Sequence, residues 1–145
     1  MPLVNLGLSS ITFFLSQQTG TWFGAWGTGA GTTALDDTTL FTESKSAEVD
    51  GSGYHRRVEC VSTQETRDKF NDIWRAVVTL VADASKTITN VGIFDSDGVA
   101  ANTTDPPAGG NLITKVDCAP SIDVPSGKSL VITFNHIFKN EGTVG

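Results

Sequence analysis

The sequence predicts an all-β protein, specifically an antiparallel β-sandwich or jelly roll with an extended N-terminal arm. Apolar and polar residues alternate in several short segments, as they do in strands that bury one face. The composition, with 15 glycines in 145 residues and abundant Ser and Thr, favours strands and turns over long helices. The clearest pattern lies in residues 111–134, where two alternating segments are joined by a Pro125-Ser-Gly-Lys turn.

The length fits one domain, and we assign residues 1–20 to an arm and residues 21–145 to the β-sandwich domain. Residues 3–15 resemble the apolar part of a signal peptide, but they lack a basic start and a small-residue cleavage site. They are also too few to span a bilayer. We therefore interpret this uncharged segment as a retained arm that a neighbouring subunit or surface covers.

The first predicted strand spans residues 21–27, where aromatic residues are interrupted by glycine. A flexible glycine-rich loop follows at residues 27–33, and it lacks the Lys that a phosphate-binding loop requires. Residues 36–43 predict a single helical turn, because Asp and Thr favour helix N-caps.

Residues 54–62 alternate as the next strand, with Val58 and Cys60 on its buried side. The strongest strand spans residues 73–82, because every second residue is apolar and the opposite face carries Arg75 and Thr79. This pattern sets the register, since a slip by one residue would expose the apolar face. The predicted buried residues are Trp74, Ala76, Val78, Leu80 and Ala82.

Further strands are predicted at residues 87–94, 112–118 and 130–138, the last with Leu130, Ile132 and Phe134 on one face. An Asp-Gly turn at residues 95–98 and a long loop at residues 99–110 separate the first two of these. About six strands with short links are typical of a sandwich or jelly roll.

The formal charge of −6 at pH 7 and the pI near 4.7 argue against a nucleic-acid partner, because phosphate binding needs clustered Lys and Arg. We also expect no membrane partner. Cys60 and Cys118 are too few for a disulfide framework and are predicted to be buried free thiols, with a single disulfide as the alternative.

Asp95, Asp97 and Asn102 offer oxygen ligands for calcium, but the downstream Glu of a calcium loop is missing. An Asp-Gly turn explains these residues better, so no metal and no cofactor is predicted.

His55 stands beside Arg56 and Arg57, which could contact an anion but more often form a solvated edge or an inter-subunit pair. His136 continues the inward parity of its strand, which favours a hydrogen-bonded core or interface residue over a general base. No nucleophile, base and acid occur at a recognisable spacing. The chain is therefore predicted not to be an enzyme.

The aromatic residues Trp22, Phe23, Trp26 and Trp74 could form a platform that stacks on sugar rings. Core filling or subunit packing explains them better, because large aromatic side chains dominate cores and interfaces.

Several segments together resemble a family of small structural proteins of tailed bacteriophages, most closely the capsid decoration (cement) proteins. The likeness covers about residues 22–138, whereas the apolar arm and the long loop at 99–109 differ from the family pattern. The segments that carry it are Trp26-Gly-Thr-Gly, residues 32–40, the pair Arg56-Arg57, Thr87-Ile-Thr-Asn-Val-Gly-Ile-Phe-Asp95, residues 110–115 and residues 124–134.

This resemblance implies a non-enzymatic virion protein on the capsid exterior that binds the major capsid protein, forms a homotrimer and stabilises the shell. The uncharged arm and the first strand are the candidate partner-binding surfaces, and removing residues 1–18 is expected to leave a folded domain that no longer binds capsids. The candidate residues are Leu3, Leu6, Leu8, Ile11, Phe13, Phe14, Trp22, Phe23 and Trp26.

Two other functions remain open at this point. The first is a phage tail or fibre component that binds a host-surface glycan through Trp22, Trp26 and residues 95–110. The second is a hydrolase that uses His55 or His136 as its base.

Overall fold

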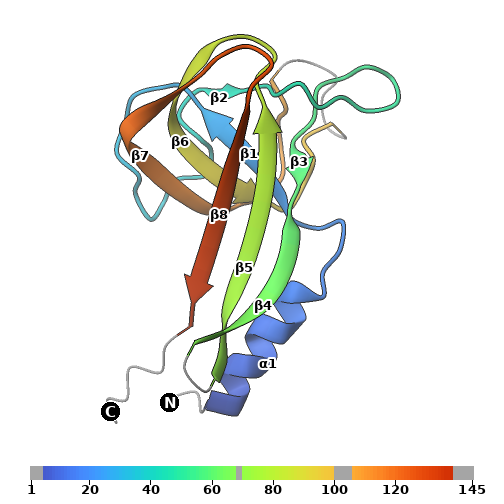
Figure 1. Cartoon of the computed structure of the whole chain (residues 1–145), viewed down its shortest axis with the longest axis vertical. Coiled ribbons are helices and arrows are strands. Elements are labelled where there is room, and N and C mark those ends of the chain that lie inside the picture. Colours follow the sequence, from blue (N-terminus) through green and yellow to red (C-terminus); the bar gives the residue numbers. More distant parts are fainter. Residues whose placement is uncertain (1–4, 68–69, 100–105, 139–145) are drawn as a thin grey trace.

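The computed structural model of the protein describes residues 5–67, 70–99 and 106–138. Within these ranges it contains two antiparallel sheets and one α-helix, which confirms the predicted all-β class (Figure 1). The helix and strands are α1 (Asn5–Ser16), β1 (Phe23–Gly27), β2 (Glu43–Ser44), β3 (Val58–Glu59), β4 (Val61–Arg67), β5 (Phe70–Val81), β6 (Lys86–Phe94), β7 (Leu112–Val124) and β8 (Ser129–Ile137).

The strands form a five-stranded first sheet and a three-stranded second sheet. The first sheet has the order β2-β1-β6-β7, and β3 also pairs with β1. The second sheet has the order β4-β5-β8. The hydrophobic core lies between the two sheets and is built around Trp26 and Ile88 from the first and Trp74, Val78 and Leu80 from the second.

The predicted face of β5 is buried from Trp74 to Leu80. Trp74, Val78 and Leu80 are each at most 2% exposed, whereas Thr79 on the opposite face is exposed. The sheets approach closely where β1 crosses β5, because a Cβ on Gly24 would lie 2.5 Å from Val78 Cγ1. This contact explains why glycine interrupts the aromatic residues of the first strand.

The second sheet continues past the first sheet, and helix α1 lies against this continuation (Figure 1). The predicted extended arm is therefore wrong for residues 5–16, which form a helix that packs on β4 and β5. A helix forms here because its backbone hydrogen bonds are satisfied internally, while one face of the helix covers the protruding sheet.

The connection from β1 to β3 contains turns, and residues 36–43 do not form the predicted helical turn. Side chains of the first sheet fix this segment. The amide of Asn90 is fully buried and pairs with the backbone N–H and carbonyl of Phe41, at 3.0 and 3.2 Å. The backbone of this segment is therefore hydrogen-bonded to the Asn90 side chain, as it would be to a neighbouring strand, and does not form the internal hydrogen bonds of a helix.

Strand β7 also supplies anchors for this connection. Lys115 forms a 2.8 Å ion pair with Asp37, and its ammonium lies 3.0 Å from the ring centroid of Phe41. The carboxylate of Asp117 accepts hydrogen bonds from the backbone N–H and hydroxyl of Thr33. These contacts hold an irregular segment in one position without a regular ladder.

Strand β7 extends beyond its predicted end at Cys118 and reaches Val124. Asn90 of β6 pairs with Asp117, and Ile88 pairs with Ile122, so residues 118–121 bulge opposite Thr89. Pro120 is tolerated inside the strand because it lies in this bulge at the edge of the sheet.

Cys60 and Cys118 are free thiols, as predicted. Cys60 is buried, and its burial, together with the nearby Glu59 charge, raises the pKa of its thiol to about 12. Cys118 is half-buried. A thiol that stays protonated at neutral pH is a poor nucleophile, so Cys60 fills space in the core.

The burial of Leu80 gives a test of the core. Replacing Leu80 with Ala is expected to lower the free energy of unfolding by about 2–5 kcal/mol, because it removes buried methyl groups and leaves a cavity. Replacing its exposed neighbour Thr79 with Ala is the control. Urea denaturation of both variants would contradict the assigned core if the Leu80 variant were as stable as the control.

Candidate assembly surface

Helix α1 places polar residues against the sheet. Thr12 is fully buried and Ser16 nearly so, and Ser9 lies one turn before Thr12. Residues three and four apart share one face of a helix, so these three residues form a single polar stripe. This stripe lies toward β4 and β5, which α1 contacts.

Polar side chains of the sheet form hydrogen bonds with this stripe. The amide of Gln64 on β4 donates hydrogen bonds to the Ser9 carbonyl at 2.8 Å and to Thr12 Oγ1 at 2.7 Å. These bonds join residues more than fifty positions apart in the chain. They add to the hydrogen bond that the Thr12 hydroxyl donates to the Ser9 carbonyl at 3.0 Å within the helix, so the polar face of α1 is bonded directly to the sheet.

The end of α1 is held in the same way. The Leu15 carbonyl accepts hydrogen bonds from the Trp22 indole and from the Ser62 hydroxyl, both at 3.2 Å. Trp74 in turn donates its indole N–H to Ser62 Oγ at 2.6 Å. Carbonyls in the last turn of a helix lack intrahelical partners, so these donors stabilise the end of α1.

The aromatic residues of α1 lie on its outer side. Phe13 and Phe14 are 50% and 65% exposed, and their rings meet edge to face with centroids 6.2 Å apart. A surface helix normally buries its apolar residues and exposes its polar ones. The described part of α1 reverses this for its largest side chains, which leaves an aromatic pair available to another molecule.

The structure separates the predicted partner-binding residues into groups. Leu3 lies outside the described residues, whereas Leu6 and Leu8 lie in α1. Ile11, also in α1, is half-buried. Only Phe13 and Phe14 are shown as an exposed pair.

The first strand does not form an aromatic surface. Trp26 is fully buried, and Trp22 packs on Trp74 with ring centroids 5.2 Å apart, while Phe23 is half-buried. The prediction that Trp26 contacts a partner is therefore corrected, because its ring fills the core. The same burial of Trp26 and Trp74 removes the four-residue sugar platform.

Sequence reasoning missed Thr12, Ser62 and Gln64, whose hydrogen bonds orient the helix. The available signal was the spacing of Ser9, Thr12 and Ser16, which recurs every three to four residues. That spacing is typical of one helix face, although its members are polar.

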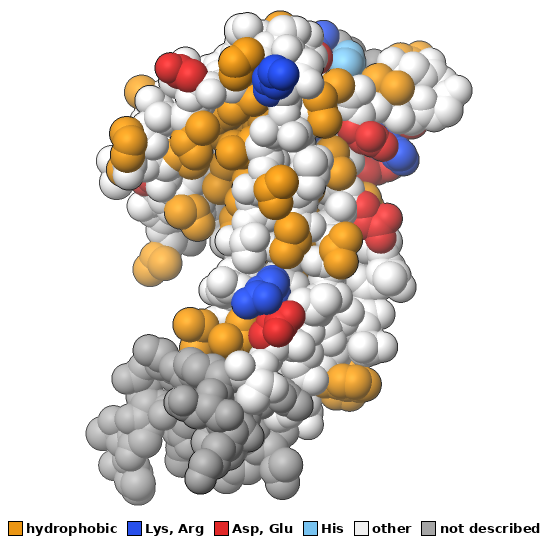
Figure 2. Space-filling model, viewed as in Figure 1, with side chains coloured by type: hydrophobic (Ala, Val, Ile, Leu, Met, Phe, Trp, Pro, Cys, Tyr) orange, Lys and Arg blue, Asp and Glu red, His pale blue; other side chains and the backbone are white. Residues whose placement is uncertain are grey.

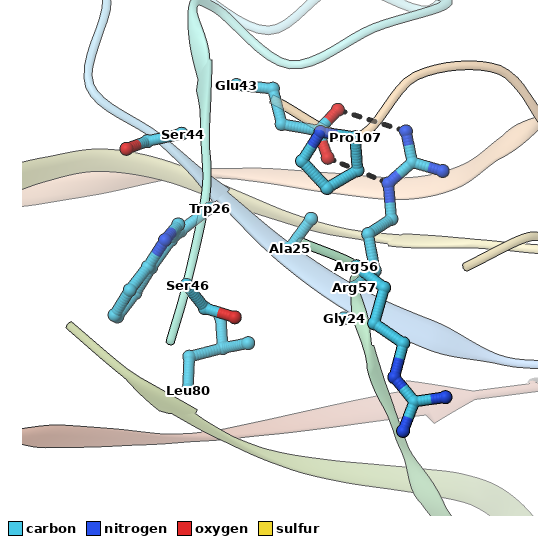
Figure 3. A pocket seen from close by; sticks show the side chains of 10 residues that line it. All are labelled: Gly24, Ala25, Trp26, Glu43, Ser44, Ser46, Arg56, Arg57, Leu80 and Pro107. Atoms are coloured by element: carbon cyan, nitrogen blue, oxygen red, sulfur yellow. Dashed lines mark hydrogen bonds and ion pairs between the residues drawn. The ribbon is translucent and has the colours of Figure 1, made fainter. Parts of the chain in front are cut away.

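The basic residues of the predicted anion site have structural roles. Arg57 is buried and forms a two-point ion pair with Glu43, with Nε–Oε1 and Nη2–Oε2 distances of 2.7 and 3.0 Å (Figure 3). Its Nη1 donates to the carbonyls of Ser96 and Gly109, both at 2.9 Å. The guanidinium also lies 3.6 Å from the centroid of the Phe94 ring.

Arg57 therefore ties β2 to both ends of the connection between β6 and β7, and it is not the solvated edge that the sequence predicts. Arg56 points away from this cluster and pairs with Glu48 at the surface (Figure 3). The pocket lined by Glu43, Arg56 and Arg57 has a free volume of about 10 Å³, which holds about one water molecule. It is too small for a substrate.

The remaining candidate groups are also engaged in local structure. His55 Nδ1 lies 2.7 Å from the Ser46 carbonyl. Hydrogen bonds from the backbone and side chain of Asn111 lower the pKa of Asp95 below its ordinary value, and Asp97 caps the backbone of Val99. In the described ranges no three His, Cys, Asp or Glu residues are grouped as metal ligands, and Asn102 lies outside those ranges.

Comparison of the chain with models of known protein families and with curated protein sequences found no significant match.

No helix in the described ranges combines the length and the apolar character needed to cross a bilayer.

The contacts of Gln64 predict how α1 is held. Replacing Gln64 with Ala is expected to cost about 1 kcal/mol and to speed hydrogen exchange in α1, while exchange in β5 and β6 stays unchanged. Replacing the exposed Thr63 with Ala is the control. Equal protection of α1 in both variants would show that the Gln64 bonds do not hold the helix.

The environment of His136 predicts a pH dependence. Its ring stacks on Trp74 at 4.5 Å, and Nε2 lies 2.6 Å from Thr114 Oγ1. Burial lowers the pKa of His136 below 6.5, although the Trp74 backbone partly opposes this. Below pH 6.5 the unfolded chain therefore binds a proton that the folded domain does not, so stability falls with the pH.

Melting curves between pH 7 and pH 5 would measure this effect. The melting temperature of the wild type is expected to fall more than that of a His136→Gln variant. An unchanged slope in the His136 variant would contradict the assignment.

Proposed function

We propose that this chain is a non-enzymatic structural protein of a tailed-bacteriophage virion that binds the outer capsid surface and stabilises the shell. The major capsid protein is the proposed partner. The likeness to decoration proteins supports the choice of virion and capsid. The exposed aromatic pair of α1 supports the choice of an assembly role over a catalytic one.

The observation that carries the proposal is the reversed helix face. Phe13 and Phe14 project from an uncharged helix, and hydrogen bonds through Gln64 and Ser62 fix that helix on the domain. Aromatic residues on a rigid element bury a large area at a low entropic cost, which is typical of interface anchors. Burial of such an anchor in a groove of a neighbouring protein is more favourable than its exposure to water.

The state of the polar groups supports a non-enzymatic role. Arg57, His55 and Asp95 each bind backbone or side-chain partners within the domain. These residues stabilise loops, so their polar groups are engaged in bonds within the fold.

A repeated capsid lattice also suits a small interface. Two aromatic side chains make a modest contact at about 25 cal/mol per Å² of buried apolar area. Several copies that act together, as linked subunits on neighbouring lattice sites, gain affinity through their high effective concentration. We therefore propose that the protein binds as an oligomer.

A double substitution tests the anchor. The variant Phe13→Ser with Phe14→Ser is expected to keep its melting temperature, because both side chains are exposed, and to bind capsids at least about tenfold more weakly. The measurement is co-sedimentation with capsids assembled from the proposed partner, the major capsid protein. The matched control is Leu35→Ser with Val49→Ser, which removes exposed apolar side chains elsewhere.

Equal capsid occupancy for the anchor variant and the control would reject the anchor. Deletion of residues 1–18 is a less clean test than the sequence suggests, because α1 also covers the inner face of β4 and β5. Loss of binding after that deletion would follow from misfolding as well as from loss of the anchor.

A further inference from the structure

The edges of the two sheets differ in their protection against pairing with other chains. Strand β7 carries Lys115, Asp117 and Asp123 and contains a bulge. Strand β4 contains Glu65 and Arg67, with a register shift between them. Charges and bulges of this kind discourage pairing at an exposed edge.

Strand β8 has none of these features. Its nine residues, Ser129-Leu-Val-Ile-Thr-Phe-Asn-His-Ile137, include no Lys, Arg, Asp, Glu or Pro. It pairs with β5 without a register shift, and in the described part of the chain β5 is its only strand partner. A long, regular and uncharged edge is a template for another strand.

The hydrogen bonds at both ends of the ladder show which backbone groups are free. Phe138 donates to the Asp72 carbonyl, and Ala82 donates to the Lys128 carbonyl, both at 2.9 Å. Because bonding alternates along an antiparallel pair, the even-numbered residues of β8 bond to β5. The odd-numbered residues from Ser129 to Ile137 therefore direct their N–H and carbonyl groups to the open edge.

The same odd-numbered residues carry the side chains of the outer sheet face. Val131 and Ile137 are 59% and 45% exposed, and Figure 2 shows hydrophobic side chains spread over this face. Arg75, which lies on the neighbouring strand β5 and faces Asn135, is already bonded to Asn135 at 2.9 Å and paired with Glu65 at 3.3 Å. The edge thus combines free backbone groups, apolar side chains and little net charge.

We propose that β8 pairs antiparallel with β8 of a second copy of this chain, which joins two three-stranded sheets into one six-stranded sheet. With Thr133 on the twofold axis, five residue pairs would form about ten backbone hydrogen bonds. A typical protein interface has about that number. This inference does not depend on capsid binding.

A second copy of this chain is the partner that fits the open edge of β8 best. Its own β8 edge has the same length, directs backbone groups outward at the same alternate residues, and carries no charged side chain. Every free group on one strand then meets a free group on the other, as an interface with twofold symmetry requires. A symmetric edge pair makes a dimer, so the geometry of β8 favours a dimer over the trimer that the resemblance implies.

A lysine at the symmetry axis tests the pairing. Thr133→Lys places two like charges opposite each other and is expected to weaken the dimer on the order of tenfold or more in sedimentation equilibrium. Thr79→Lys is the matched control, because Thr79 is also exposed on the outer face but lies on the central strand β5. This control should dimerise like the wild type, and both variants should melt like the wild type at low protein concentration, where association contributes little to stability.

A cysteine at the axis tests the register. Facing residues in a hydrogen-bonded antiparallel pair have Cα atoms about 5.5 Å apart, which a disulfide can bridge. In a Cys118→Ser background, Thr133→Cys is expected to form a covalent dimer on mild oxidation, and Thr79→Cys is not.

Three results would overturn the inference. The first is a wild type that sediments as a monomer at about 100 μM, a concentration far above the Kd of a stable dimer. The second is an oligomer that Thr133→Lys leaves intact. The third is equal cross-linking of both cysteine variants. A monomeric wild type that loses capsid binding through Thr133→Lys would assign the edge to a capsid strand instead of a second copy.

Discussion

The length of the second sheet is the constraint on which the rest of the structure depends. Strand β5 continues past the first sheet, so the inner face of this continuation would be exposed to solvent if no other element packed on it (Figure 1). Helix α1 supplies that cover through polar contacts of Thr12 and Gln64. Because the buried contacts of the helix are partly polar, Phe13 and Phe14 remain outside, and the fold itself creates an aromatic surface.

A second consequence concerns the charged residues. The irregular connection between β1 and β3 has few ladder bonds, so ion pairs and hydrogen bonds of side chains fix it. Arg57 binds Glu43 and two loop carbonyls, and Lys115 binds Asp37. These ion pairs are largely removed from solvent, and breaking one partner would leave a buried charge, which is costly. The charged groups therefore serve the fold.

The surfaces left for other molecules are mainly apolar or backbone groups. The aromatic pair on α1 and the open edge of β8 lie on different elements, so one does not block the other by sharing residues. A module with two such surfaces can contact a neighbour through one and a second copy through the other. This arrangement suits repeated assembly, in which modest contacts act together.

The sequence by itself determined the all-β class and the inward face of β5 and β8, because alternation along a strand is a local property. It did not determine that residues 5–16 form a helix, that Trp26 lies in the core, or that Arg57 is buried. Those outcomes depend on partners far along the chain, such as Gln64 for Thr12 and Gly109 for Arg57. A polar residue is buried only where the tertiary structure supplies its hydrogen bonds, and a local pattern does not contain that information.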